Sequence, residues 1–227
     1  MIAEVLLNDP EKRNALSMAM FDSIDKQLAQ AQDATVIRLR ATGSAFCAGF
    51  DLAACVDDPT MLAILLKRLG NLAMQLRSHR AIVIAEVNGA AIAGGCAIVS
   101  ATDIVLAAPT ATFGYPVHRL GISPAVSLPT LLEGLTSGAA RSLVLSGEII
   151  DAEVAMKIGL VHRIEADLPA AGEALAERLA SFPDPERIAG KAFFEAPNND
   201  CPTAASIDTA NTSEAAKMLK AYWSKRS

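Results

Sequence analysis

The sequence predicts an α/β fold with parallel strands. Segments with strand and helix patterns alternate through most of its 227 residues, as in folds where helices cover a parallel sheet. Residues 81–87 are apolar except for Glu86, which is typical of a strand buried on both faces. Hydrophobic residues make up 52% of the chain, so it can build a sizeable core.

The N-terminal part contains two predicted strands and two predicted helices. Apolar residues 5–7 end at the turn sequence Asn8-Asp9-Pro10. Ser17 can cap a helix over about residues 18–31, where apolar residues recur at helical spacing. Alternation predicts a strand over residues 35–40, followed by a loop of small residues at 43–49. A second helix is expected from Pro59 and Thr60 to about residue 78.

From residue 81 onward the pattern continues. A buried strand at 81–87, the turn Asn88-Gly89 and a short buried helix at 94–101 account for an apolar stretch that superficially resembles a membrane span. Residues 103–107 read as a strand and residues 113–120 as an irregular extended stretch. Further helices are expected at 124–135, 137–145, 151–158 and 168–181, with a last strand at 161–164.

A composition change suggests two domains. After Phe182-Pro183-Asp184-Pro185 the chain becomes polar and only patchily helical. We therefore expect a core domain over residues 1–185. Residues 186–227 would form a small helical C-terminal region that acts in oligomerisation or as a lid.

Charge and cysteine content exclude several function classes. The net charge is −5 without a Lys/Arg block, which argues against nucleic-acid binding. The four cysteines lack CxxC spacing and there are only three histidines, so we expect no metal site. The first residues lack the apolar region of a signal peptide, and we expect neither a membrane association nor an oxidising compartment but a cytoplasmic protein.

Two bends of small residues are the strongest chemical features. They lie at residues 44–52 and 88–96, each after a predicted strand, while GxSxG, GxGxxG and phosphate-loop motifs are missing. A glycine pair at the start of a helix leaves N–H groups without partners, and two such bends can converge on one anionic oxygen. The alternative is that both are ordinary tight turns packed against a sheet.

Five stretches in order resemble the motifs of the crotonase (enoyl-CoA hydratase/isomerase) family. They are PEKRNAL at 10–16, AFCAGFDL at 45–52, VNGAAIAGGC at 87–96, the Asp103-Ile104, FGYP and LGI segments within 103–122, and LSGE, Asp151-Ala152 and GLV within 145–161. The resemblance covers about residues 3–183. It implies a spiral of ββα units with a helical C-terminal part, assembled as a homotrimer or homohexamer.

The resemblance also implies a site. An oxyanion hole would be formed by the backbone N–H groups of Phe50 and Gly94, and the ligand would be an acyl-CoA thioester with no cofactor beyond the coenzyme A of the substrate. Arg13 would pair with a phosphate, although a solvated turn charge is an equal alternative. The remaining expected substrate-binding residues are Ala15, Ala48, Gly49, Asp51, Leu52, Gly95 and Val117, with Asp51 also interpretable as a brace for its own loop.

The pattern departs from the family at the catalytic carboxylates. Hydratases of this family place glutamates where this chain has Ala97 and Val117, and some relatives use an acid where it has Ala125. Adding water across a double bond needs a base and an acid at the reacting atoms, and these side chains supply neither. His118 and Tyr115 are the candidate replacements. On an extended chain Tyr115 would share the side of Val117 and His118 would point away.

The expected function is therefore that of a family enzyme that stabilises a thioester enolate or oxyanion, with isomerase, lyase or hydrolase chemistry rather than hydration. The main alternative is a non-catalytic acyl-CoA-binding protein of the same fold. A purely structural subunit is a third.

Overall fold

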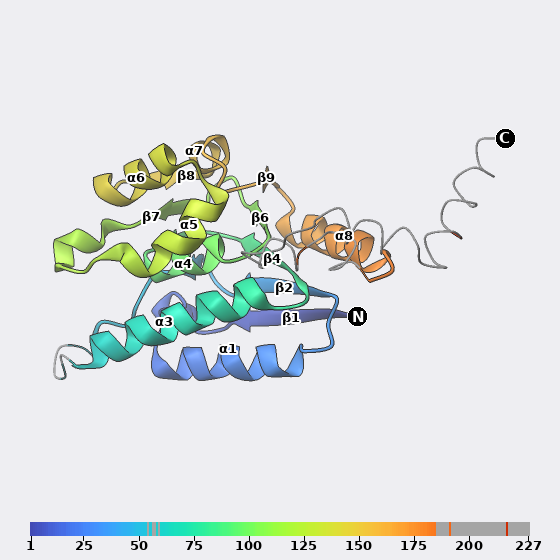
Figure 1. Ribbon diagram of the computed structural model, residues 1–227, viewed down its shortest axis with the longest axis horizontal. Helices are drawn as coiled ribbons and strands as arrows, with labels where there is room; N and C mark the ends of the chain where they lie inside the picture. Colours follow the sequence, from blue (N-terminus) through green and yellow to red (C-terminus); the bar gives the residue numbers. More distant parts are fainter. Residues whose placement is uncertain (54, 56–57, 59, 185–190, 192–216, 218–227) are drawn as a thin grey trace, which may run out of the picture.

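The computed structural model describes residues 1–53, 55, 58, 60–184, 191 and 217. Figure 1 shows the described chain as strands in two sheets with helices packed around them. Alternation of strand and helix is confirmed, and so is the α/β class with parallel strands.

A five-stranded sheet contains the longer strands of the fold and joins its N-terminal part to β9 near residue 163. Its strands are β1 (Ile2–Leu7), β2 (Val36–Ala41), β4 (Ile82–Val87), β6 (Ile104–Ala107) and β9 (Arg163–Ile164). They lie in the order β1-β2-β4-β6-β9, and every neighbouring pair is parallel. The central strand β4 is buried along its whole length, as the apolar run at 81–87 predicts.

A second sheet of four short strands stands beside the first. It contains β3 (Ala45–Cys47), β5 (Ala90–Ile92), β7 (Thr112–Gly114) and β8 (Ile149–Asp151) in the order β3-β5-β7-β8, with only the β7–β8 pair antiparallel. Strands β2, β4 and β6 of the first sheet each lead into a strand of the second and then into helical structure. This repeated unit is the ββα unit expected from the sequence resemblance.

Helices cover both sheets. They are α1 (Met18–Gln30), α3 (Thr60–Ser78), α4 (Gly94–Ser100), α5 (Leu128–Gly134), α6 (Ser137–Ser146), α7 (Ala152–Lys157) and α8 (Leu168–Ala180), with 3-10 helices η1 (Pro10–Lys12), η2 (Pro116–Leu120) and η3 (Pro124–Ser127). Ser17 caps α1, because its hydroxyl accepts a hydrogen bond from the Met20 N–H at 3.1 Å. No helix in the described part of the chain is long and apolar enough to cross a membrane.

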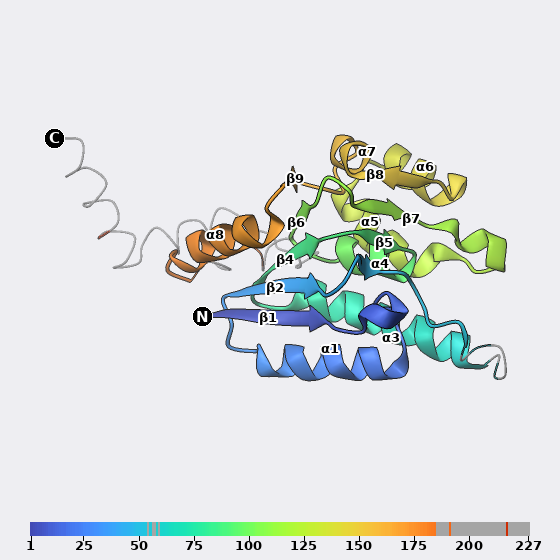
Figure 2. The same ribbon diagram turned by 180° about the vertical axis from the view of Figure 1, so that it is seen from behind.

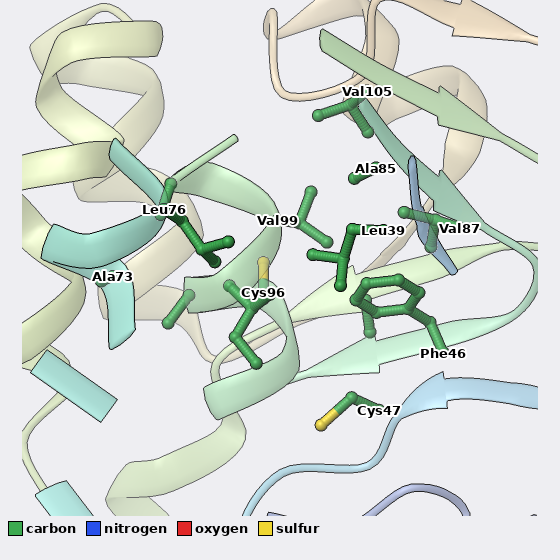
Figure 3. Packing of buried hydrophobic residues seen from close by; sticks show 14 of the residues in the cluster. Leu39, Phe46, Cys47, Ala73, Leu76, Ala85, Val87, Cys96, Val99 and Val105 are labelled. Carbon is green, nitrogen blue, oxygen red and sulfur yellow. The ribbon is translucent and has the colours of Figure 1, made fainter. Parts of the chain in front are cut away.

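The two faces of the first sheet carry separate apolar clusters. Alternate residues of a strand point to opposite faces. Leu39, Val87 and Val105 lie in the main core with Phe46 of β3 and Val99 of α4 (Figure 3). On the other face, Val36, Ile84 and Leu106 pack beneath α8 against Leu168 and Leu175. Figure 2 shows α8 lying apart from α1 and α3, which run side by side.

Glu86 lies within β4 and is only 2% exposed. It forms ion pairs with Arg38 (2.5 Å) and Arg40 (3.3 Å), and the Arg38 guanidinium also donates to the Pro169 carbonyl at 2.9 Å. A buried carboxylate with two guanidinium partners links the sheet to α8. The Glu86 carboxylate is therefore paired with arginines beneath α8 and is not a free acid.

Two predictions about local structure are wrong. The segment 43–49, expected to be a loop, contains the short strand β3 (Ala45–Cys47). Residues 116–120 are not extended, because η2 begins at Pro116. Proline favours a helix start, since its φ angle is preset and its missing N–H is not needed there. The argument that Tyr115 and Val117 share one side of an extended strand therefore fails, and their positions follow from η2 instead.

The predicted C-terminal region at 186–227 lies outside the described residues, apart from Lys191 and Lys217. The Lys191 ammonium donates to the Ala81 carbonyl at 2.7 Å and to the Asp103 carboxylate at 2.6 Å. Lys191 therefore contacts the residues just before β4 and β6, which lie at the same edge of the sheet because these strands are parallel.

Candidate active site

The two small-residue bends lie against each other. A Cβ atom on Gly89 would stand 2.1 Å from the Ser44 carbonyl oxygen, and one on Gly95 would stand 2.4 Å from the Cys47 carbonyl oxygen. Only glycine permits backbone contacts this close. The glycines at these two positions therefore bring the bends together, and the predicted binding residue Gly95 packs on Cys47.

A cavity of about 150 Å³ lies where the bends meet. Its walls come from both bends, from α3, and from the segment that includes η2 and η3. They consist of Ala48, Gly49, Phe50, Leu52, Leu66, Leu69, Ile92, Ala93, Gly94, Tyr115, Pro116, Val117, Leu120, Ile122, Ser123, Pro124, Val126 and Ser127. Seven of the residues expected at the site from the sequence line this cavity: Phe50, Gly94, Tyr115, Ala48, Gly49, Leu52 and Val117.

The Phe50 amide is directed by a single β-bridge between Leu16 and Phe50. In it the Leu16 N–H donates to the Gly49 carbonyl at 2.7 Å, and the Asp51 N–H donates to the Leu16 carbonyl at 3.2 Å. Successive N–H groups along such a bridge point to opposite sides. The Phe50 N–H, which lies between the two paired groups, is therefore turned away from Leu16.

The Gly94 amide belongs to the first residue of α4. N–H groups in the first turn of a helix have no carbonyl one turn earlier to pair with. A Cβ on Gly94 would stand 2.7 Å from a methyl carbon of Leu16 and 3.8 Å from the Phe50 ring, so the Phe50 and Gly94 residues are direct neighbours. The cavity is thus lined by Phe50 and Gly94, which come from separate bends.

Ala93, immediately before Gly94, has φ 52° and ψ −108°. This combination lies outside the regions that residues with a Cβ ordinarily occupy, and glycine adopts it readily. Hydrogen bonds hold the strained residue in place: its N–H donates to the Gly114 carbonyl at 2.8 Å, and its carbonyl accepts from the Ala97 N–H at 2.9 Å. Strain of this kind persists where surrounding structure enforces it, often at functional sites.

No carboxylate, imidazole or ammonium group is found among the described residues that line the cavity. Ala97 is 1% exposed inside α4, and Val117 lines the cavity. The polar side chains of the lining are the hydroxyls of Tyr115, Ser123 and Ser127. Hydrogen bonding rather than charge is the chemistry that these walls offer.

Tyr115 is 1% exposed, and its hydroxyl has no hydrogen-bond partner within the described chain. The side chains of Ser127, Ser100 and Cys96 are the polar groups that lie close to it. Burial raises the pKa of the Tyr115 phenol well above its usual range, and the adjacent Cys96 raises it further. Burial also raises the pKa of Cys96 to about 12, so at neutral pH both groups are protonated.

His118 is exposed on η2 and does not line the cavity. Its ring lies over Gly147 at the end of α6, where a Cβ would stand 2.0 Å from its Nε2 atom. Ala125 is exposed on η3 and also lies outside the lining. Of the two candidates for proton transfer, Tyr115 lines the cavity and His118 does not.

Arg13, Ala15 and Asp51 are not part of the cavity wall; the first two lie beside the first bend, and Asp51 belongs to it. The Ala48 N–H donates to the Arg13 carbonyl at 3.1 Å, and the Arg13 side chain is exposed. The Asp51 carboxylate accepts a hydrogen bond from Lys12 at 2.9 Å. This ion pair is consistent with a structural role for Asp51, in which its carboxylate holds its own loop in place.

Asn14 holds the first bend in place through its side chain, and the sequence analysis did not predict this role. It is fully buried, its side-chain amide donates to the carbonyls of Thr42 (2.8 Å) and Ala45 (2.9 Å), and its Oδ1 accepts from the Asp9 N–H at 2.8 Å. These bonds fasten the first bend to the end of β1. An asparagine in a turn motif is a recognisable signal, because its side chain often substitutes for backbone partners.

Ser127 and the α3 leucines Leu66 and Leu69 were not expected at the site either. The leucines carry only the signal of an inner helix face, and such a signal does not distinguish a cavity wall from a core. Ser127 lies at the end of η3 and is 2% exposed. Its place at the cavity depends on how η3 packs against α3 and α4, which no local pattern shows.

Comparisons with known proteins agree with this architecture. A family model described as enoyl-CoA hydratase/isomerase matches residues 1–224. The human mitochondrial enoyl-CoA hydratase domain-containing protein 3 is 32% identical over 200 residues, which cover 85% of this chain and 66% of that protein, just under two thirds of its length.

Solved structures give the same result. The crystal structure of human enoyl-CoA hydratase domain-containing protein 3 superposes with a TM-score of 0.89 at 28% identity, covering 100% of this chain and 95% of that chain. An enoyl-CoA hydratase from Mycobacterium smegmatis gives 0.89 at 26% identity, covering 99% and 93%. The matched length, the ββα units and the paired bends together place this chain in the enoyl-CoA hydratase/isomerase family of the crotonase superfamily.

Proposed function

We propose that this protein binds an acyl-CoA thioester with its carbonyl oxygen between the Phe50 and Gly94 amides. The observation that carries the proposal is that Phe50 and Gly94, which come from separate bends, both line one apolar cavity. Negative charge develops on a thioester oxygen as an enolate or tetrahedral adduct forms. Preorganised donors in a dry pocket stabilise that charge, and loss of one donor typically costs about 3–4 kcal/mol.

The reaction would be isomerase, lyase or hydrolase chemistry rather than hydration. A hydratase needs a base to activate water and an acid to protonate carbon. The side chains at the two positions where family hydratases carry glutamates are Ala97 and Val117, and neither can transfer a proton. The described cavity wall holds no other carboxylate that could act in their place.

Tyr115 would be the donor closest to the acyl group. Because burial raises the pKa of its phenol, it remains protonated at neutral pH and acts as a hydrogen-bond donor rather than as a base. His118 remains a second candidate for proton transfer, but its ring must first leave Gly147 to reach the cavity. Loss of turnover in His118→Ala with Tyr115→Phe unaffected would assign the transfer to the histidine.

Coenzyme A would lie along the first bend. The exposed Arg13 side chain stands on the turn whose carbonyl is hydrogen-bonded to Ala48, so it is close enough to the bend to pair with a phosphate. The backbone near Ala15, Ala48 and Phe50 would contact the pantetheine and adenine, and the Lys12–Asp51 ion pair would hold the bend in place. Arg13→Ala should then weaken binding of every acyl-CoA by a similar factor.

A non-catalytic acyl-CoA-binding protein is the second candidate. The cavity wall of hydroxyls and apolar groups favours it, because this wall provides binding contacts without a titratable group whose ordinary pKa lies near neutrality. We also propose a cytoplasmic homotrimer or homohexamer. Mass measurement in solution would test the assembly.

The two candidates separate when affinity and turnover are measured together. Crotonyl-, 3-enoyl- and malonyl-type CoA thioesters would be titrated by calorimetry, and the same mixtures analysed for products by liquid chromatography. Binding with product formation supports the enzyme, and tight binding without any product supports the binding protein. If no acyl-CoA binds at all, both candidates are wrong.

A further inference from the structure

The cavity has an exposed side and a buried side. Among its described lining residues, Leu120 is 58% exposed and Ser123 is exposed as well, so these two lie at its mouth. Leu69 and Ser127 are each only 2% exposed, so they belong to the inner wall. A Cβ on Gly94 would stand 3.7 Å from Leu69 Cδ2. The inner wall therefore begins beside the residue proposed to hold the thioester oxygen.

Close packing between α3 and η3 closes this inner wall. Gly70 of α3 follows Leu69, and a Cβ added to it would stand 3.3 Å from Val126 Cγ2 of η3. That distance is tighter than ordinary van der Waals contact, so the missing side chain of Gly70 is what lets η3 lie so near to α3. Val126 itself lines the cavity and packs against the main core. Val126 and Leu69 thus close the cavity between the two elements.

The size and charge of the cavity restrict what can enter. A cavity of about 150 Å³ is comparable to one that accommodates a benzene-sized molecule, so it suits an acyl group of up to about six carbon atoms. No described lining side chain is charged, so a carboxylate on the acyl group would be buried without a counter-ion, which is strongly unfavourable. The cavity therefore favours small, uncharged groups.

We propose that this site takes short, uncharged acyl groups and that Val126 sets the limit on their length. This inference rests on the proposed function and adds its substrate class. With the thioester oxygen at the Phe50 and Gly94 amides, the acyl chain extends along Leu69 toward the wall that Val126 closes. Each methylene group that the cavity accepts leaves water and increases affinity about fourfold. A longer chain must displace packed side chains of α3 or η3, which lowers affinity.

The test is calorimetric titration of a series of saturated CoA thioesters with acetyl, butyryl, hexanoyl, octanoyl and decanoyl groups. We expect the affinity of the wild-type protein to rise from acetyl- to hexanoyl-CoA and to fall beyond it, so that decanoyl-CoA binds about tenfold more weakly than hexanoyl-CoA. Succinyl-CoA has the chain length of butyryl-CoA and a terminal carboxylate. It should bind about tenfold more weakly than butyryl-CoA.

Three variants test the role of Val126. Val126→Ala removes both γ-methyl groups and makes room for about two more carbon atoms, so the affinity for octanoyl-CoA relative to hexanoyl-CoA should rise about tenfold. Val126→Thr keeps the branched shape and should keep the wild-type order of chain lengths. Val144→Ala removes the same atoms from α6, where Val144 is 7% exposed and outside the cavity lining, and should not alter the ratio. Circular dichroism would verify that each variant is folded.

The outcomes are distinguishable. If affinity is equal for all chain lengths or keeps rising to decanoyl-CoA, the length limit is wrong while the proposed function stands. If Val126→Ala retains the wild-type ratio, or if Val126→Thr or Val144→Ala changes it as much, Val126 does not set the limit. Preferred binding of succinyl-CoA overturns the uncharged acyl group. Absence of binding to every thioester rejects the proposed function and, with it, the specificity built on it.

Discussion

The second bend contains a residue whose replacement should make the protein more stable. Ala93 has φ 52° and ψ −108°, and such a conformation costs a residue with a Cβ about 1–3 kcal/mol. Glycine avoids this strain, but it is more flexible in the unfolded chain, which offsets about 0.5–1 kcal/mol. Ala93→Gly should therefore raise the free energy of unfolding by about 1 kcal/mol.

The expected change is measurable by urea denaturation and by calorimetry. For a chain of this length, 1 kcal/mol corresponds to a rise in Tm of about 2–4 °C. Ala91→Gly is the matched control, because Ala91 is fully buried in the regular strand β5 and pairs with Phe113 of β7. There the same change removes a packed methyl group and adds flexibility, so stability should fall by about 1 kcal/mol or more.

The pair of variants gives a clear refutation. If Ala93→Gly lowers stability as much as Ala91→Gly does, the backbone at position 93 is not strained in solution. The consequence for function is separate: the Ala93 methyl group borders the cavity, so its removal also enlarges the space beside the Gly94 amide. Acyl-CoA affinity of the variant would show whether that methyl contacts the ligand.

Three further predictions test other parts of the same framework. Asn14→Ala should lower the free energy of unfolding by about 3 kcal/mol, because it leaves buried backbone groups at three sites without their partner; a loss below about 1 kcal/mol in urea titrations would contradict the role of Asn14 as a fastener. Gly89→Ala should destabilise the protein by about 3 kcal/mol, because the added Cβ would meet a carbonyl oxygen. The control Gly134→Ala in α5, which has open space around it, should be neutral or stabilise by about 0.5 kcal/mol. Similar melting temperatures for both variants would show that the bends are not in close contact. Burial lowers the pKa of His162 in the folded protein, so below about pH 6.5 the unfolded chain takes up the proton first and stability should decrease toward lower pH. In His162→Gln the stability should decrease less steeply toward low pH, and the decrease that remains is expected from His79, whose pKa burial also lowers. An unchanged pH profile of chemical denaturation in this variant would contradict the prediction.

The helices and the main strands could be predicted because their signals are local. Apolar spacing and the Ser17 cap indicate α1, and a continuous apolar run indicates the buried strand β4. The prediction fails at η2, where the proline at position 116 starts a helical turn in a segment whose apolar residues suggested an extended chain. A proline is compatible with both conformations, and the packing of the surrounding segments decides between them.

Candidate site residues were predictable where they belong to the bends and not where they come from distant elements. The glycines of the bends signal close backbone contact, and the resemblance to the family motifs is what named Phe50, Gly94 and their neighbours as candidates. The sequence left both His118 and Tyr115 as candidates for proton transfer, with Tyr115 expected on the side of Val117. The structure separates them, with Tyr115 buried at the cavity and His118 over Gly147.

The sequence by itself determined the fold class, the order of the ββα units and the two bends, because each is a property of residue identity or short-range spacing. Only the tertiary structure decided that Ser127, Leu66 and Leu69 line the same cavity as those bends, that Tyr115 is buried at this cavity, and that Ala93 is strained. These features arise from contacts between segments distant along the chain. They depend on how the sheets and helices pack, and local sequence patterns carry no record of that packing.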